Sequence, residues 1–221
     1  MEIITKRIPT IDVLRGIIMA LMALDHTRDY FHIDAMTQNP VDLATTTPLL
    51  FFTRWITHYC APTFVFLSGT SAYLQSLRKT KKQLGWFLFT RGLWLIIAEF
   101  TIVNFGWSFD PFFSFFFLQV IWAIGCSMVI LSGLIFFRYW VIAFLGIAIT
   151  LCHNLMDYTY ITDPEVMAAA NVFLVTNFKV YPLLGTHIMI GYAVLPWTGI
   201  MLLGAGITPL RLQPCNAVNF W

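Results

Sequence analysis

The first apolar stretch of the chain carries more ionisable residues than a membrane helix ordinarily tolerates. Residues 11–31 read IDVLRGIIMALMALDHTRDYF, and their middle, 16–24, is free of charge. The ionisable residues on either side of this middle are Asp12, Arg15, Asp25, His26, Arg28 and Asp29. An ionisable group inside a membrane helix costs about 3 kcal/mol on insertion scales. A helix that carries several of them is therefore a functional-site hypothesis.

Depth along the predicted helices sorts the polar residues into two layers. With a helical rise of about 1.5 Å per residue, His26, His58 and His153 each fall roughly 8–9 Å toward the outer side of their spans. Glu99 and Gln119 fall at a similar depth, and further out lie Arg54, Asn104, Asn154 and Asp157. The inner half holds Asp12, Arg15 and Arg91. These side chains must face the bundle interior or a water-filled cavity, because lipid cannot satisfy them.

Helical periodicity adds information on faces. At about 100° per residue, one arc of roughly 80° holds Asp12, Arg15, Met19, Met22, His26 and Asp29, with Asp25 just off its edge. Arg28 points elsewhere, and we expect Arg28 and Asp29 to lie at the membrane interface. Arg54 and His58 share a face, although Arg54 alternatively extends to the outer surface. Each histidine alternatively makes only a structural hydrogen bond between helices.

Composition places the chain in a membrane. Of its 221 residues, 58% are hydrophobic and 11% are charged, whereas a soluble globular domain carries about 25% charged residues. The net charge of +2 and the lack of a basic reading motif argue against a nucleic-acid partner. The four cysteines form no CxxC pair, so we expect neither a metal site nor a disulfide framework.

We predict an all-α fold, a polytopic transmembrane helical bundle, because several stretches reach the length of about 20 apolar residues that a span needs. The six candidate spans are 11–31, 50–77, 84–105, 113–136, 139–157 and 185–207. Residues 1–204 form one membrane domain, and 205–221 form an atypical tail. In the outer loop 158–184, Asp163-Pro164-Glu165 predicts the start of a short surface helix.

Charge in the connections predicts the orientation. Lys6, Arg7, the basic turn 78–82 and Arg138 fall on one side, and the opposite loops are mainly acidic. The positive-inside rule therefore places the N-terminus in the cytoplasm. The basic turn alternatively binds anionic lipid.

Two blocks of the sequence resemble one known family. Residues 7–26, RIPTIDVLRGIIMALMALDH, resemble the start of the heparan-alpha-glucosaminide N-acetyltransferase catalytic-domain family, whose pattern is a basic residue, S-x-D-x-x-R-G and an apolar run. Residues 61–71, APTFVFLSGTS, resemble the family block F-P-x-F-x-F-x-x-G-x-S. Later stretches, among them NFGW at 104–107 and PWTGIMLLG at 196–204, resemble an uncharacterised bacterial branch.

The resemblance implies a multi-pass membrane acetyltransferase of the bacterial cytoplasmic (inner) membrane. Such an enzyme takes acetyl from cytoplasmic acetyl-CoA and delivers it to a sugar amine or hydroxyl on the outer side. Its partners are the lipid bilayer, a small-molecule or glycan acceptor and, alternatively, further copies of itself in a homo-oligomer. Family members generally have more spans, and 205–221 departs from their pattern, so we expect a C-terminally truncated chain. At His58 the better-known members carry an acid, and near His26 they often carry an amide.

The implied reaction assigns roles to the outer residues. Acetyl transfer from a thioester needs a base for the acceptor and donors for the oxyanion. We expect His26 to be the base, oriented by Asp25 or Asp29, because histidine titrates near neutral pH. His58 is the second candidate, either as the base or as an oxyanion donor.

The other polar residues are assigned by side. Arg15 and Arg91, in the inner half, are expected to meet the phosphates of acetyl-CoA. The polar residues expected on the substrate side are Arg54, Glu99, Asn104, Gln119 and His153. No metal is expected, since three histidines on separate spans are weak evidence for one.

Two other functions fit the same residues. Buried His, Asp and Glu also form proton relays, so the chain is alternatively a proton-coupled small-molecule transporter. Against a transporter, the predicted spans show no paired broken helices and no inverted repeat. The abrupt C-terminus also fits an inactive remnant or an assembly subunit.

Reporter fusions test the predicted orientation. A reporter that works only in the cytoplasm should be active in the 78–82 turn and inactive in the 32–49 loop, because cationic connections stay inside. An exported reporter that is active at 78–82 would contradict both the orientation and the two polar layers.

Overall fold

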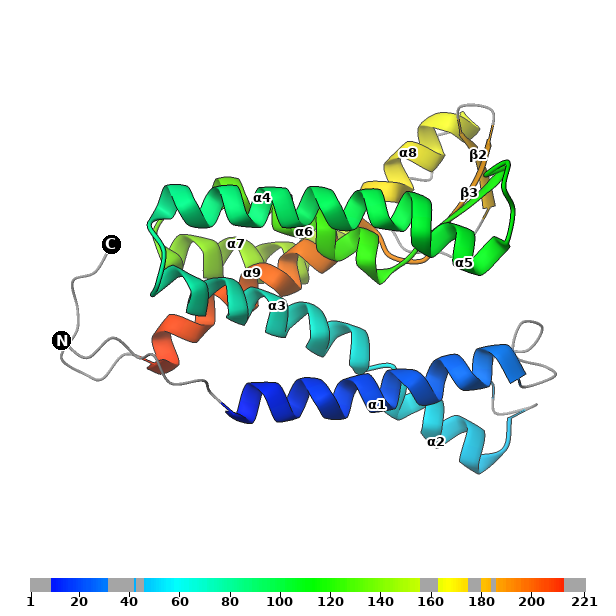
Figure 1. Cartoon of the computed structure of the whole chain (residues 1–221), viewed down its shortest axis with the longest axis horizontal. Helices are drawn as coiled ribbons and strands as arrows, with labels where there is room; N and C mark the ends of the chain where they lie inside the picture. The colour runs from blue at the N-terminus through cyan, green and yellow to red at the C-terminus, as the bar shows by residue number, and fades with distance from the viewer. Residues whose placement is uncertain are drawn as a thin grey trace. The chain divides into compact units, whose positions relative to one another are not determined.

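The structure is a computed structural model that describes residues 9–31, 42, 46–155, 163–174, 180–183 and 186–212. Within these residues the chain is mostly helical and forms a three-stranded sheet (Figure 1). The chain divides into two compact units, Met1–Leu67 and Ser68–Trp221. The division falls inside one helix, α3 (Cys60–Ser76).

The first unit contains α1 (Pro9–Phe31), α2 (Pro48–Thr57) and the first part of α3. α1 confirms the helix predicted over 11–31 and begins at a proline, which suits the first turn of a helix. α2 also begins at a proline, and the Thr47 side chain caps it by accepting from the Leu50 N–H at 3.3 Å. α1 and α3 share a small apolar core, whose buried members are Ile18, Cys60 and Leu67.

The prediction of one helix over 50–77 is wrong, because the chain breaks between α2 and α3. The His58 N–H donates to the Arg54 carbonyl at 3.0 Å and closes the end of α2. Pro62 explains the break, since proline has no N–H and its ring clashes with the carbonyl four residues earlier, at His58. Proline is tolerated in the first turn of a helix, so α3 begins at Cys60.

The second unit continues α3 and adds a helical run over Lys81–Ser108. Its parts are α4 (Lys81–Ala98), a π-helical turn η1 (Glu99–Val103) and α5 (Asn104–Ser108). The run confirms an apolar helix over the predicted span 84–105 and continues past it at both ends. A capping box between Thr80 and Gln83 starts α4.

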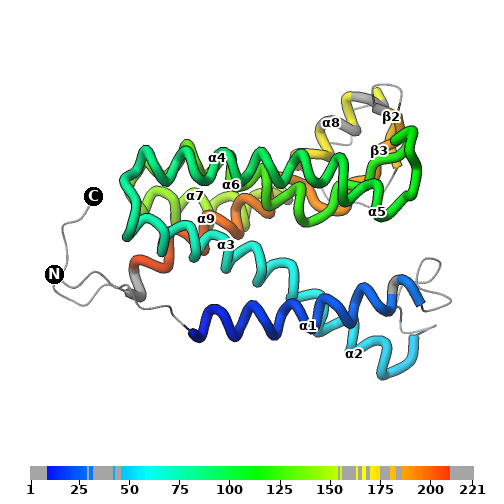
Figure 2. The backbone as a smooth tube through the Cα atoms, viewed as in Figure 1, coloured from blue at the N-terminus to red at the C-terminus, as the bar shows by residue number. Residues whose placement is uncertain are grey.

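Four helices of this unit pack lengthwise: α4, α6 (Val120–Leu134), α7 (Tyr139–Cys152) and α9 (Val194–Leu212) (Figure 1, Figure 2). α4 packs on α6, and both α6 and α7 pack on α9. Among the described residues, only Lys81–Ser108 is a helix long and apolar enough to cross a membrane, for which about 20 residues are needed. The apolar parts of α6, α7 and α9 are shorter, so the six-span bundle stays a prediction.

A sheet with the strand order β1-β3-β2 lies at one end of these helices (Figure 1). The strands are β1 (Phe115–Leu118), β2 (Val180–Leu183) and β3 (Thr186–Ile190). β3 runs parallel to β1, with Phe115 opposite His187, and antiparallel to β2, with Val180 opposite Met189. Residues 115–118 and 187–190 thus pair although about 70 residues separate them, more than enough for the crossover that parallel strands need.

The sheet corrects the predicted fold class and two predicted spans. The helical class is right for most of the described chain, but 113–136 and 185–207 each begin with a strand. Their helices begin only at Val120 and Val194. Periodicity cannot assign a short apolar run to helix or strand, while Phe and Ile favour strands. The apolar sequence therefore predicts one long helix where the chain has a strand followed by a helix.

The segment after α6 agrees with two predictions. α7 and the short 3-10 turn η2 (His153–Leu155) follow the predicted span 139–157 as far as the described residues reach. The helix predicted at Asp163-Pro164-Glu165 is confirmed as α8 (Pro164–Leu174). The Asp163 carboxylate accepts from the Val166 N–H at 3.1 Å, and Pro164 is the first helical residue.

Glycines bring α4 and α6 into backbone contact. A Cβ atom added to Gly92 of α4 would lie 2.6 Å from the carbonyl oxygen of Gly125 in α6. A Cβ atom added to Gly125 would lie 2.9 Å from the carbonyl oxygen of Gly92. Small residues of this kind let membrane helices approach closely, so the α4–α6 contact depends on these two positions.

Gly125→Ala should destabilise the protein, because the added methyl group has no room against α4. Overpacking costs about 1–3 kcal/mol, which we expect to see as a lower melting temperature of the purified protein in detergent by circular dichroism. Gly133→Ala is the matched control in α6: a Cβ atom there meets nothing within 4 Å, and alanine gains up to about 1 kcal/mol over glycine in a helix. Equal melting temperatures of the two variants would contradict the close contact.

Candidate active site

Asp25 is the centre of a polar network between α1 and α2 in the first unit. Arg54 Nη1 lies 2.8 Å from Asp25 Oδ2, and Arg28 Nη1 lies 2.8 Å from Asp25 Oδ1. The Thr57 hydroxyl donates to Oδ1 at 2.8 Å. One carboxylate therefore joins two guanidinium groups and a hydroxyl.

Helical spacing explains how these side chains meet. Asp25 and Arg28 lie three residues apart on α1, and Arg54 and Thr57 lie three residues apart on α2, so each pair shares one face of its helix. The exposed fractions of the charged side chains are low, at 17% for Asp25, 12% for Arg28 and 29% for Arg54. In such surroundings the charge-assisted hydrogen bonds are stronger than at an open surface, and they hold α2 against α1.

The network gives Arg28 a partner and adds one residue. Arg28 turns to Asp25, because a partly buried guanidinium needs a counterion. Its expected position at the membrane interface stays a prediction. Arg54 also bonds to Asp25 and therefore does not extend to the outer surface, which was the alternative for this residue. Sequence reasoning missed Thr57, whose spacing of three residues from Arg54 is the signal that could have indicated it.

The histidines predicted to act as bases adjoin this network along the chain. His26 follows Asp25 on α1 and is exposed. His58 follows Thr57, ends α2 and is also exposed. The oxygens of Asp25 already accept from the network, so the orientation of His26 by Asp25 stays a prediction. The side chain of Asp29 lies outside the described part of the chain.

The two arginines predicted to meet acetyl-CoA lie in different units. Arg15 of α1 is half-buried, and its Nη2 donates to the Leu67 carbonyl of α3 at 3.2 Å. Arg91 of α4 is exposed, with Cζ 5.2 Å from the centroid of the Phe87 ring. Lys79 Nζ lies 4.7 Å from the same centroid, so one ring attracts two cations. Their role toward the donor stays a prediction.

Glu99 and Asn104, predicted on the substrate side, bind the backbone that leads from β1 into α6. Glu99 is fully buried, and its Oε1 accepts from the N–H of Gln119, the N-cap of α6, at 2.7 Å. Asn104 donates to the Phe115 carbonyl at 3.0 Å and accepts from the Phe117 N–H at 3.1 Å. Glu99 thus places a carboxylate at a helix N-terminus, where the dipole favours it. Asn104 pairs with the edge of β1 that β3 leaves open.

Further polar atoms are buried where α6 begins. Glu99 Oε2, Gln119 Nε2 and Trp122 Nε1 are buried without a hydrogen-bond partner among the described residues. His153, at the end of α7, has Nδ1 3.0 Å from the Thr150 carbonyl, so Nδ1 carries the hydrogen and donates. The substrate-side roles of these residues stay predictions.

The Asp25 network can act through charge and proton transfer. Its guanidinium groups can stabilise an anion that forms beside them. The adjoining His26 and His58 can take a proton from an amine or hydroxyl. Within the described ranges no three His, Cys, Asp or Glu side chains gather to hold a metal ion. Guanidinium groups and a nearby base suit group transfer through an oxyanion.

Comparison with known proteins finds one family. A family model described as heparan-alpha-glucosaminide N-acetyltransferase, catalytic, matches residues 7–217. No curated protein and no solved structure matches the chain. The matched segment contains all the site residues named above and both sequence blocks, 7–26 and 61–71.

Thr57→Val should destabilise the first unit, because Asp25 loses a charge-assisted hydrogen bond in partly buried surroundings. A hydrogen bond to a charged group contributes about 1.5–3 kcal/mol, which we expect to see as a lower melting temperature in detergent. Thr53→Val is the matched control on α2, because the Thr53 hydroxyl donates only within the helix, to the Leu49 and Leu50 carbonyls. If both variants melt alike, Thr57 does not hold the carboxylate.

Proposed function

We infer the function from the family: the chain belongs to the heparan-alpha-glucosaminide N-acetyltransferase catalytic family. We propose that it is a membrane enzyme that transfers acetyl from cytoplasmic acetyl-CoA to a sugar amine or hydroxyl on the outer side of the bacterial inner membrane. The family match over residues 7–217 is the observation that carries this proposal. The long apolar helix Lys81–Ser108 supports the membrane setting.

The proposed reaction uses the histidines and the Asp25 network. His26 takes the proton of the acceptor while the acceptor nitrogen or oxygen attacks the thioester carbonyl. The carbonyl oxygen becomes an oxyanion, and the guanidinium groups held by Asp25 would stabilise it. The C–S bond then breaks, and coenzyme A leaves as a thiolate that takes up a proton. Asp25 itself is a positioning residue in this scheme, because it holds Arg28 and Arg54 in place.

Arg15 supports the donor side of the proposal. It lies ten residues before Asp25 on the same helix, which corresponds to about 15 Å along the axis. A guanidinium suits phosphate because it offers paired N–H donors in one plane. In the predicted orientation Arg15 lies toward the cytoplasm, so α1 would connect the phosphates of the donor with the acceptor side. Arg91 is proposed as a second phosphate contact.

Acetyl transfer can be tested with the full chain in inside-out membrane vesicles. Acetyl-CoA labelled in its acetyl group is added outside, and glucosamine is enclosed as the acceptor. We expect labelled N-acetylglucosamine inside the vesicles. His26→Ala should lower the rate about 10²–10⁴-fold, because a general base supplies a factor of this size.

His187→Ala is the control, since this histidine is exposed on β3 and plays no part in the proposed reaction. It should keep the wild-type rate. His58→Ala measured alongside identifies the base: a larger loss than that of His26→Ala would exchange their roles. Full activity of His26→Ala would remove His26 from the reaction. Uptake of glucosamine without acetyl-CoA and without labelled product would contradict the proposal and favour a transporter.

A further inference from the structure

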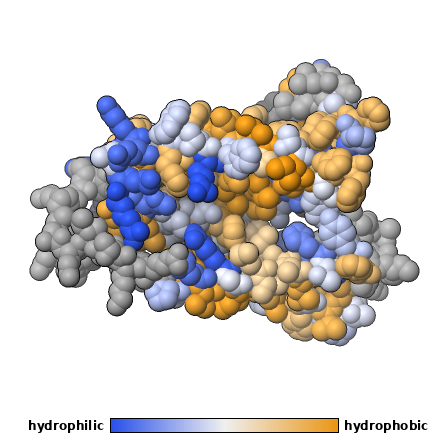
Figure 3. Space-filling view, in the orientation of Figure 1, coloured by the Kyte–Doolittle hydropathy of each residue, from blue (hydrophilic) through white to orange (hydrophobic). Residues whose placement is uncertain are grey.

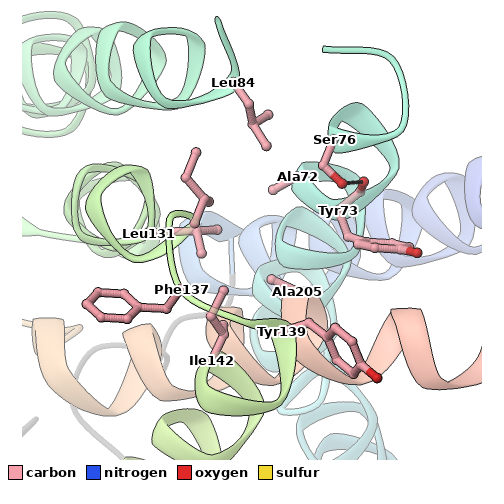
Figure 4. Close-up of a pocket in the computed structure, with 10 residues that line it drawn as sticks. Ala72, Tyr73, Ser76, Leu84, Leu131, Phe137, Tyr139, Ile142 and Ala205 are labelled. Atoms are coloured by element: carbon pink, nitrogen blue, oxygen red, sulfur yellow. Dashed lines mark hydrogen bonds between the residues drawn. The ribbon is translucent and has the colours of Figure 1, made fainter. Parts of the chain in front are cut away.

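An apolar pocket lies among α3, α4, α6, α7 and α9 in the second unit (Figure 4). Its walls include Leu84, Leu131, Ile142 and Ala205. In Figure 4 the aliphatic side chains of Leu84, Leu131 and Ile142 approach the opening from three helices. The empty volume, including the part that is open to the surroundings, is about 360 Å³. The pocket is therefore a partly open hollow with hydrocarbon walls, against which part of an acyl chain can pack.

The polar groups of the lining are hydroxyls near the rim, on Tyr73, Ser76 and Tyr139. The Ser76 hydroxyl donates to the Tyr73 carbonyl at 2.6 Å, so it is already used within α3. The hydroxyls of Tyr73 and Tyr139 lie on the same side of the opening and point away from Leu131 (Figure 4). Tyrosine is common at the level of lipid headgroups, with its ring toward the tails and its hydroxyl toward water. The pocket thus combines apolar walls with a rim suited to a membrane interface.

Basic side chains gather at the same end of the unit. The α3–α4 and α6–α7 turns carry Arg78, Lys79, Lys81, Lys82 and Arg138. Lys81 Nζ donates to the Phe136 carbonyl at 3.3 Å, which joins the two turns. Both turns are continuous with the pocket, because they are flanked by lining residues on each side. Figure 3 shows hydrophilic residues gathered over the beginning of α4 and hydrophobic residues over its middle.

Lys79, Lys82 and Arg138 have no acidic residue near them in the sequence. The chain has no Asp or Glu between Asp42 and Glu99, or between Asp110 and Asp157. Lys82 also occupies the first turn of α4, where the helix dipole disfavours positive charge. An anion bound beside these three cations would be attracted to them.

We propose that the pocket binds one anionic phospholipid, with part of an acyl chain against the apolar walls and the phosphate against Lys79, Lys82 and Arg138. The walls argue against the pantetheine arm of coenzyme A, because its amide groups would lose their hydrogen bonds to water there. A hydrocarbon chain has no such bonds to lose. The predicted orientation places this end at the cytoplasmic leaflet, whose anionic lipids attract basic segments. This inference goes beyond acetyl transfer and does not depend on it.

Lipid binding can be measured by native mass spectrometry of the delipidated full chain in detergent. Phosphatidylglycerol and phosphatidylcholine with identical acyl chains are titrated separately. We expect one tightly bound phosphatidylglycerol and weaker binding of phosphatidylcholine. Exchange of Lys79, Lys82 and Arg138 for glutamine should weaken phosphatidylglycerol binding about fivefold per cation removed, the ratio that corresponds to the attraction of one basic residue to an anionic surface.

A second variant tests the pocket itself. Ser76→Phe fills the rim from α3 and should abolish tight phosphatidylglycerol binding. Thr90→Phe is its matched control, because Thr90 is exposed on α4 and its hydroxyl also bonds only within its own helix, to the Trp86 carbonyl at 2.9 Å. Equal binding of the two lipids, or undiminished binding by Ser76→Phe, would overturn the proposal. Displacement of the lipid by coenzyme A at equal concentration would also overturn it and assign the pocket to the donor.

Discussion

A charged side chain in a chain this apolar must find its partner within the protein, and both units are organised by this requirement. A charge left without a partner in surroundings of low dielectric is costly. In the first unit Asp25 forms ion pairs with Arg28 and Arg54, and the pair with Arg54 holds α2 against α1. In the second unit Glu99 lies buried at the start of α6, where backbone N–H groups would otherwise lack a partner. Asp25 and Glu99, two polar residues within apolar sequence, thus lie where helices contact one another.

The same groups are suited to chemistry because the network fixes the positions of its charged side chains. Asp25 holds the guanidinium groups of Arg28 and Arg54 in a partly buried place. A preorganised charge of this kind can stabilise an oxyanion without the reorganisation that water would need. The reaction that the family match supports has such an intermediate. A structural ion pair and a site for acetyl transfer are therefore compatible uses of Asp25, Arg28 and Arg54.

The polar features of the second unit lie at its two ends. At one end, Glu99 and Asn104 join the long helix to the start of α6 and to β1. At the other end, cations of two turns surround an apolar pocket. Between them the backbones of α4 and α6 touch at Gly92 and Gly125, where no larger residue fits. A rigid apolar middle with polar ends is the arrangement that a bilayer requires of a helical bundle.

The sequence by itself determined the family, α1, the long apolar helix Lys81–Ser108 and the capped start of α8, because motifs, apolar length and proline act over a few neighbouring residues. Pro62 is a local signal for the break within 50–77. The apolar length of this segment nevertheless favours one continuous helix. Only the tertiary structure decided that 115–118 is a strand, that Arg54 turns to Asp25 and that Thr57 joins them. A strand needs a partner strand, and an ion pair needs a counterion. Here those partners lie about 30 to 70 residues away, so local preference does not specify them.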